Sequence, residues 1–386
     1  MKSILSGIII STLLASTLTA CGSQDTGSAT TTSGNTESSD VIRIAHIGPF
    51  SGNGVSYGTW DSLGIEMAVA EVNEKGGIQG KKIEIVKIDD QGNPTVSVNA
   101  AHKVINEGVT AVFATPLSTT TLATLEAFNQ AKIPQLSAGQ GIEITTKGSQ
   151  YIFRYNASSS TFTKTSADYL VNKRGFKKIA IITNSGAFGR GEHDTFTAEL
   201  KAMNVTPVAD EVVTPDAKDF SAQLSNIKNA NPDAVYIGTE DIQGGLITKQ
   251  ARALGITAQI VGGASFATDV YVNTAGKENA EGTIFTTTYI DDDSEEVKAF
   301  KEAYKKKYGK EAEAPSFIAK GYDGAKILIE ALNKAYPNLD GEHIRSALLD
   351  LNYDALIGNF DFNETGEGLE NAQLGIIKDG QFKSLE

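Results

Sequence analysis

A run of hydroxyl side chains, Leu117-Ser118-Thr119-Thr120-Thr121, is the segment best suited to bind a small anion. It follows an apolar, strand-like segment at 111–114 and opens a helical pattern at 121–131. Backbone N–H groups at the start of a helix lack partners within the helix, and the helix dipole favours negative charge there. Hydroxyl donors in the same place suit a carboxylate. Ser118 or Thr119 could equally serve as the helix cap, so the residues alone leave both interpretations open.

No pattern of catalytic, metal-binding or cofactor-binding residues accompanies this segment. The nearest approach to a nucleophile elbow, at 263–267, ends in Ala instead of Gly. The glycines at 186–191 have the wrong order for a dinucleotide loop, and the sequence has no phosphate-loop motif. We interpret the acidic run at 291–296 as a solvated helix start instead of a calcium loop. We therefore expect no enzyme activity, no metal and no cofactor.

Alternating strand-like and helical segments must position the hydroxyl run. A first series of such segments extends to 151–154, and a second series begins after it. Expected strands lie at 41–49, 82–88, 111–114, 133–137, 178–183, 211–213, 234–238, 259–262 and 282–288, with helices between them, and two helices at 294–308 and 317–335 precede short strands at 358–362 and 374–377. Such alternation predicts parallel sheets covered by helices on both faces. The length of the chain favours two lobes over one.

The N-terminal segment has the order of a secretory signal, with Lys2 followed by an apolar run too short to span a bilayer. Leu18-Thr19-Ala20-Cys21 resembles the lipobox of bacterial lipoproteins, in which the cysteine is acylated and becomes the mature N-terminus. We therefore expect a signal peptide at 1–20 and lipidation of Cys21; a buried or unpaired thiol is the alternative. Residues 22–40 contain no large apolar side chain, so we interpret 21–40 as a lipid-anchored flexible linker.

The formal net charge of −13 disfavours nucleic acid as a partner. No later stretch approaches eighteen apolar residues, so we expect no second membrane segment. Together with the signal and lipidation motifs, these features predict an extracytoplasmic protein attached to the cell membrane by lipid.

Several motifs resemble those of the leucine/isoleucine/valine-binding proteins, the solute receptors of bacterial ABC importers. They are Ile47-Gly48-Pro49-Phe50-Ser51-Gly52, Tyr57-Gly58, the segment at 72–81 and the segment at 89–94. The resemblance implies the type I periplasmic-binding-protein fold, an α/β fold with two doubly wound parallel-sheet lobes joined by three crossovers. Lobe 1 would comprise 41–156 and 287–357, and lobe 2 would comprise 157–286 and 358–386. The crossovers would lie near 154–158, 283–288 and 357–362.

The resemblance also implies a binding site between the lobes, whose closure would trap a small ligand for an ABC permease. Ser118, or Thr119 one register along, would bind a ligand carboxylate. Backbone contacts would come from the loop after the next strand. In this chain that loop contains Gly139, Gln140 and Gly141, and Leu117 precedes the hydroxyls. The remaining implied contacts, each of which could instead be plain core, are Tyr57, Trp60, Phe188 and Phe317.

Two departures from the family pattern leave the ligand open. Relatives commonly place a carboxylate against the ligand's ammonium, where this chain has Ala264, and often a threonine where it has Gly141. An unpaired ammonium in a closed cleft is costly. Either Glu240 or Asp241 replaces the missing carboxylate, which favours a hydrophobic (branched-chain or aromatic) amino acid, or the ligand lacks an ammonium, as an aromatic or keto acid does. A sensory ligand-binding protein of the same fold is the remaining alternative.

Overall fold

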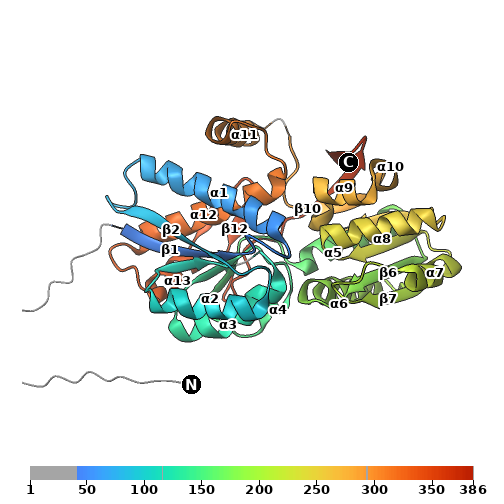
Figure 1. The fold of residues 1–386 in the computed structure, drawn as a ribbon, viewed down its shortest axis with the longest axis horizontal. Coiled ribbons are helices and arrows are strands. Elements are labelled where there is room, and N and C mark those ends of the chain that lie inside the picture. Colours follow the sequence, from blue (N-terminus) through green and yellow to red (C-terminus); the bar gives the residue numbers. More distant parts are fainter. Residues whose placement is uncertain (1–40, 115, 293, 386) are drawn as a thin grey trace, which may run out of the picture. The chain divides into compact units, whose positions relative to one another are not determined.

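Two β-sheets flanked by helices organise the chain into two α/β lobes (Figure 1). The computed structural model describes residues 41–114, 116–292 and 294–385. The expected signal peptide at 1–20, the linker at 21–40 and the lipidation site Cys21 lie outside the described residues. The α/β architecture expected from the alternating sequence is confirmed.

The sheet of lobe 1 has five parallel strands in the order β2-β1-β3-β4-β5. Its strands are β1 (Val41–Gly48), β2 (Lys82–Asp89), β3 (Ala111–Phe113), β4 (Gln135–Ser137) and β5 (Ile152–Arg154). Its helices are α1 (Val55–Glu74), α2 (Pro94–Asn106), α3 (Ser118–Ala131), α4 (Glu143–Thr146), α11 (Glu295–Tyr308), α12 (Pro315–Ala335) and α13 (Gly341–Leu349). The strand order reverses between β1 and β3, which is where ligands bind in open parallel sheets.

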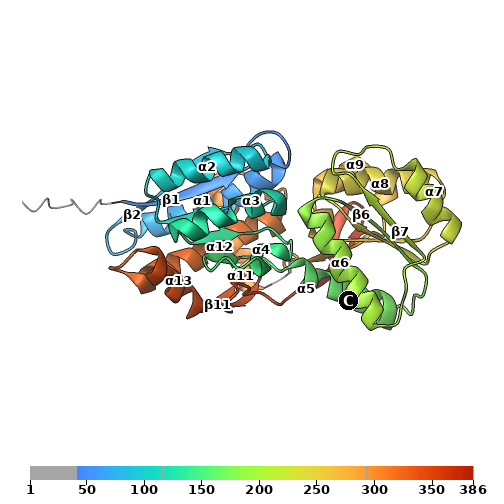
Figure 2. The same ribbon diagram turned by 90° about the horizontal axis from the view of Figure 1, so that it is seen from below.

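Both faces of this sheet are covered, as the alternation of side chains along β1 requires. Ile42 and Ile44 pack in a core with α1 and α12, whereas Ala45 and Ile47 pack with α2 and α3. Figure 1 shows α1 above the strands and α2 and α3 below them, and Figure 2 shows the same lobe from below. The lobe is therefore a three-layer sandwich.

Helices α1 and α12 approach each other closely because glycines line their contact. A Cβ atom on Gly64 would lie 2.0 Å from the backbone oxygen of Ile318, and one on Gly321 would lie 2.2 Å from that of Asp61. No residue other than glycine fits at either position without moving a backbone. The contact fixes Asp61 of α1 and the neighbouring turn of α12 against one another.

The sheet of lobe 2 has seven strands in the order β14-β13-β10-β9-β8-β6-β7. Its strands are β6 (Ile179–Asn184), β7 (Ala209–Val213), β8 (Ala234–Gly238), β9 (Gln259–Gly262), β10 (Ile284–Thr287), β13 (Gln373–Lys378) and β14 (Gln381–Ser384). Strands β6 to β10 are parallel and repeat the strand order of lobe 1, whereas β13 and β14 are antiparallel. The expected all-parallel sheet thus has an antiparallel edge, built by a hairpin at Asp379 and Gly380.

Helices cover both faces of the second sheet as well. Its helical elements are α5 (Ser159–Asp168), a π-helical turn (Tyr169–Lys173), α6 (Ala187–Ala202), α7 (Ser221–Ala230), α8 (Asp241–Ala253), a 3₁₀ turn (Ala264–Phe266), α9 (Asp269–Ala275) and α10 (Lys277–Ala280). Helices α7, α8 and α9 pack on one face, and α5 and α6 pack on the other. Alternate residues of β6 supply the two cores, with Ala180 and Ile182 in one and Ile179 and Ile181 in the other.

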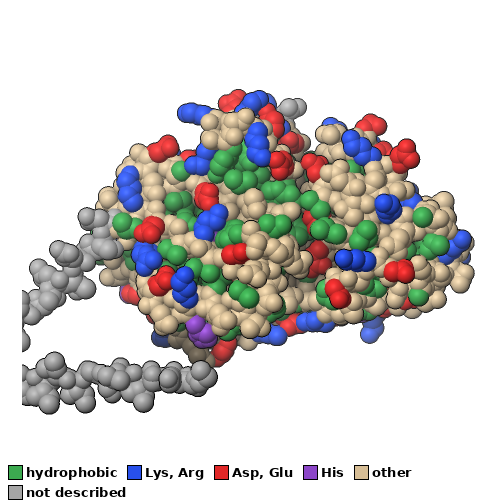
Figure 3. Space-filling view, viewed as in Figure 1, with side chains coloured by type: hydrophobic (Ala, Val, Ile, Leu, Met, Phe, Trp, Pro, Cys, Tyr) green, Lys and Arg blue, Asp and Glu red, His purple; other side chains and the backbone are tan. Residues whose placement is uncertain are grey.

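Acidic and basic side chains are interspersed on the face shown in Figure 3. Within the described residues, no group of three or more His, Cys, Asp or Glu side chains is arranged to hold a metal ion. In the same part of the chain, no helix is both long and apolar enough to cross a membrane.

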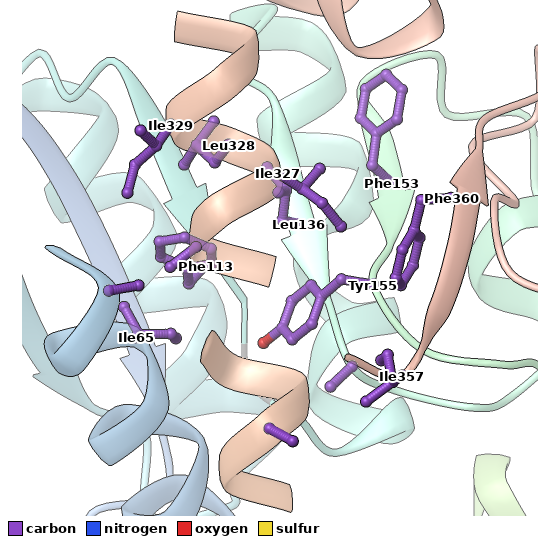
Figure 4. Packing of buried hydrophobic residues seen from close by; sticks show 14 of the residues in the cluster. Ile65, Phe113, Leu136, Phe153, Tyr155, Ile327, Leu328, Ile329, Ile357 and Phe360 are labelled. Atoms are coloured by element: carbon purple, nitrogen blue, oxygen red, sulfur yellow. The ribbon is translucent and has the colours of Figure 1, made fainter. Parts of the chain in front are cut away.

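Core residues show where the chain passes between lobes. Tyr155 lies in the core of lobe 1, where it reaches from the end of β5 toward α12 (Figure 4). Tyr289, just after β10, returns to that core. The chain stays there through β11 (Asn352–Ala355) and β12 (Gly358–Asp361) as far as Leu369, and it joins the second sheet at β13. The third crossover therefore follows Leu369 and lies beyond the 357–362 that the resemblance implied.

Candidate functional site

A cavity lies where the carboxyl ends of both sheets meet. Lobe 1 contributes Tyr57, Asp61, Pro116, Leu117, Ser118, Ala138, Gln140, Asn156, Phe317 and Lys320, and lobe 2 contributes Phe188, Glu240 and Ser265. The space open to the centre of a water molecule is about 50 Å³. The lobes touch around it, since the backbone N–H of Asp241 donates to the Tyr57 hydroxyl over 3.1 Å. The cavity is thus sized for a small ligand held between lobes.

Ser118 directs a hydroxyl into this cavity at the start of α3. Its Oγ accepts a hydrogen bond from the backbone N–H of Gly141 over 3.0 Å, which leaves its own proton free to donate. The N-cap is Leu117, whose side chain makes no capping hydrogen bond. The helix therefore starts earlier than the sequence suggested, and the capping interpretation of Ser118 and Thr119 is wrong. Thr119 Oγ1 instead accepts from the backbone N–H of Ala187 over 3.3 Å, across the two lobes.

The loop after β4 is fixed from behind by Arg154, which is fully buried. The guanidinium donates to the backbone oxygen of Gly139 and, over 3.0 Å, to that of Gly141. On its other side it donates to Glu367 over 3.0 Å. Because Gly141 in turn donates to Ser118, Arg154 positions the part of the cavity around Ser118 without lining it.

Glu240 is the carboxylate of lobe 2 that faces the cavity. Its Oε2 accepts from the Asn184 amide over 2.6 Å, and burial raises its pKa. Asp241 lies one residue further, outside the lining, and burial raises its pKa to about 6. Ala264 is fully buried on the same lobe and offers no charge. Glu240 is therefore the better placed of the two candidate partners for a ligand ammonium.

Three aromatic side chains, Tyr57, Phe188 and Phe317, form much of the apolar lining, together with Pro116, Leu117 and Ala138. The Tyr57 and Phe317 ring centroids are 5.2 Å apart. Trp60 lies behind them, 5.9 Å from Tyr57 and 5.6 Å from Phe317, and does not line the cavity. This surface suits a hydrocarbon group.

The structure brings most residues of the expected site together. Those that line the cavity are Tyr57, Leu117, Ser118, Gln140, Phe188, Glu240 and Phe317. Those that do not are Trp60, Thr119, Gly139, Gly141 and Asp241. Four polar lining residues were not expected, namely Asp61, Asn156, Ser265 and Lys320. One signal could have pointed to Lys320, a lone lysine among the apolar residues 317–319 of a buried helical pattern.

A second buried carboxyl group lies beneath the lobe 2 wall. Glu192 of α6 is fully buried, accepts a hydrogen bond from the Tyr236 hydroxyl and approaches Gly263. Burial, with a smaller contribution from Glu240, raises the pKa of Glu192 to about 7. Since an ordinary glutamate titrates near pH ~4.3, the folded state binds more protons than the unfolded state between those values. Stability should therefore fall as the pH rises through this window.

Glu192→Gln is expected to remove this pH dependence. The variant should match the parent near pH 4 and exceed its free energy of unfolding by roughly 2 kcal/mol at pH 8, because the amide is never ionised. Denaturant unfolding at the two pH values measures the difference. The exposed Glu278→Gln variant is the control and should follow the parent at both; an equal gain at pH 4 and pH 8 for Glu192→Gln would contradict the titration.

Comparison with known proteins agrees with this geometry. The family model described as periplasmic binding protein matches residues 41–381. The chain belongs to the periplasmic binding protein family. The Leu/Ile/Val-binding protein of Escherichia coli is 31% identical over 337 residues, which cover 87% of this chain and 90% of that protein.

Solved structures of other binding proteins have a similar fold to this periplasmic binding protein. LivJ of Streptococcus pneumoniae, a branched-chain amino acid transporter substrate binding protein in complex with isoleucine, has a TM-score of 0.81 at 27% identity and covers 89% of this chain and 98% of its own. A solute binding protein from Rhodopseudomonas palustris BisB5, in complex with 3,4-dihydroxybenzoic acid, has a TM-score of 0.80 at 26% identity, covering 90% and 96%. The expected type I periplasmic-binding-protein fold is thereby confirmed.

Proposed function

We propose that this chain is the solute receptor of an ABC importer and that it captures an amino acid by closure of its two lobes. The observation that carries the proposal is the pairing within one cavity of Ser118, at the start of α3 in lobe 1, with Glu240 in lobe 2. A hydroxyl beside a helix start suits the ligand carboxylate. The partly buried carboxylate of Glu240 suits the ligand ammonium. Closing the lobes brings both partners onto one ligand.

The side chain of the ligand would pack on Tyr57, Phe188 and Phe317. This apolar surface supports the branched-chain or aromatic amino acid expected from the sequence, and the isoleucine bound by the Streptococcus pneumoniae relative is of that kind. A ligand without an ammonium, such as an aromatic or keto acid, is the second candidate. It is favoured by Ala264 and by the Asn184 amide, which already occupies one oxygen of Glu240.

Delivery to a permease would take place outside the cytoplasm. In this proposal residues 1–20 are removed, Cys21 is acylated, and 21–40 tethers the lobes to the membrane. The tether would keep the receptor near its permease. Support comes from the order of charged, apolar and small polar residues at the N-terminus, and from the family to which the chain belongs.

Ser118→Ala tests the carboxylate contact. Calorimetry with the twenty amino acids and a panel of aromatic and keto acids first identifies a ligand. The variant should then bind it more weakly by about 1–3 kcal/mol, because a charge-assisted hydrogen bond is lost. Ser225→Ala, an exposed serine of α7, is the control. Unchanged affinity in Ser118→Ala would remove Ser118 from the site, and a panel without any binder would remove the proposed function.

A further inference from the structure

Lys320 is a buried amine in the cavity that the proposed amino-acid contacts leave unused. Its side chain lines the cavity although the residue is only 1% exposed, and its Nζ has no hydrogen-bond partner. The nearest recorded contact is the Phe317 ring, whose centroid lies 4.1 Å from Nζ. Phe317 and Lys320 are three residues apart on α12, so they present adjacent surfaces to the same space.

Asp61 is the acidic residue whose charge raises the pKa of Lys320, yet its own hydrogen bond and ion pair are with other residues. Its Oδ2 accepts from the Tyr155 hydroxyl over 2.8 Å and lies 3.4 Å from His46 Nε2. Among the described residues, no carboxylate oxygen lies within 4.0 Å of Lys320 Nζ. Burial lowers the pKa of Lys320 to about 7, and Asp61 only partly opposes that change. The amine therefore still needs a hydrogen-bond acceptor.

An unpaired acceptor faces the same cavity. Gln140 is 9% exposed, and its Oε1 has no hydrogen-bond partner. Buried polar groups without partners are costly, and a ligand that expels water without replacing its hydrogen bonds binds weakly. A ligand with a purely hydrocarbon side chain would leave Lys320 Nζ and Gln140 Oε1 buried without hydrogen-bond partners.

We propose that Lys320 recognises an oxygen at the tip of the ligand's side chain. The preferred ligand is then not a purely hydrocarbon branched-chain or aromatic amino acid but one with a short hydrocarbon stem and a neutral polar tip, a carboxamide or a hydroxyl. The stem packs on Phe317, the tip oxygen accepts from Lys320, and the N–H or O–H of the tip is available to Gln140. Asp61 places negative charge beside Lys320, which disfavours a second carboxylate at the tip. This inference rests on the proposed function, which supplies the contacts of the ligand's carboxylate and ammonium.

Pairs of ligands with equal shape and different polarity test the inference. Calorimetry on the wild-type protein should show asparagine binding at least about tenfold more tightly than leucine, and threonine more tightly than valine, because a site built to hydrogen-bond its substrate rejects the analogue that lacks the polar group. Aspartate should bind more weakly than asparagine. Leucine binding as tightly as asparagine, or aspartate binding more tightly, would overturn the inference.

The Lys320→Met variant is expected to reverse the preference for asparagine over leucine. The variant should lose about tenfold or more of its asparagine affinity and gain affinity for leucine, because the unpaired amine is gone. Lys326→Met, on the partly exposed face of the same helix, is the control and should keep the wild-type preference. An unchanged asparagine-to-leucine ratio in Lys320→Met would overturn the inference. If amino acids bind but hydrocarbon side chains are preferred, only this inference fails; if none binds, the proposed function fails.

Discussion

Replacing Arg154 by Met is expected to lower the free energy of unfolding by about 3–5 kcal/mol, the usual effect of removing one partner of a buried ion pair. Arg154 is fully buried, whereas the side chain of Glu367 is 26% exposed. The substitution leaves Glu367 without its cation and removes the guanidinium donors from the backbone oxygens of Gly139 and Gly141, the second of which still accepts from the backbone N–H of Ile144. Methionine fills much of the volume, so the loss is electrostatic more than steric.

The same substitution should also weaken ligand binding. Gly141 holds Ser118 through its N–H, and Arg154 holds Gly141 through its carbonyl, so a looser loop no longer fixes the hydroxyl toward the carboxylate. Denaturant unfolding and calorimetry measure the two effects. Arg43→Met is the control, because Arg43 is partly exposed and its contact with Glu107 spans 3.6 Å; exposed pairs contribute about 0–1 kcal/mol. Equal losses in both variants would show that the buried network does not stabilise the fold.

Local patterns were sufficient to predict most of the fold. The spacing of apolar residues within each segment, and the Gly-rich breaks between segments, are local features of the sequence. They correctly placed β1, β2, β6 and β8. The antiparallel edge of lobe 2 was missed. Its signal is Asp379-Gly380, whose positive φ angles of 54° and 72° suit a two-residue hairpin turn. The alternation of strands and helices predicts only parallel strands, so it gave no reason to expect β13 and β14 to run antiparallel.

The site divides in the same way. The residues Ser118, Gln140 and Glu240 each follow a strand. Ser118 was expected from the hydroxyl run and the resemblance, and Gln140 and Glu240 from the resemblance; all three lie where parallel strands bring their carboxyl ends to one edge. Asp61 and Lys320 were not expected, since they reach the cavity through the packing of α1 on α12, two helices far apart in the sequence. The role of Arg154 was missed for the same reason, because Glu367 joins it only in the folded chain.

Glu240→Gln is expected to weaken the binding of an amino acid by about 2–5 kcal/mol, because the ligand's ammonium would lose its buried partner. The side-chain oxygen of the new amide can still accept from Asn184, so the fold should be retained, as thermal unfolding will check. Burial raises the pKa of Glu240, and only the ionised form pairs with an ammonium. Amino-acid affinity of the parent should therefore weaken as the pH falls, whereas the variant should lack this dependence.

Two comparisons decide which group meets the ammonium. Asp241→Asn removes the same charge one residue away, outside the cavity lining, and should change affinity far less than Glu240→Gln does. The keto acid with the same side chain as the amino-acid ligand lacks the ammonium, so Glu240→Gln should leave its binding unchanged or strengthen it. A large loss in Asp241→Asn alone would transfer the role to Asp241. If neither substitution weakens the binding of a ligand, that ligand has no ammonium, because a buried ammonium that loses its carboxylate partner binds more weakly.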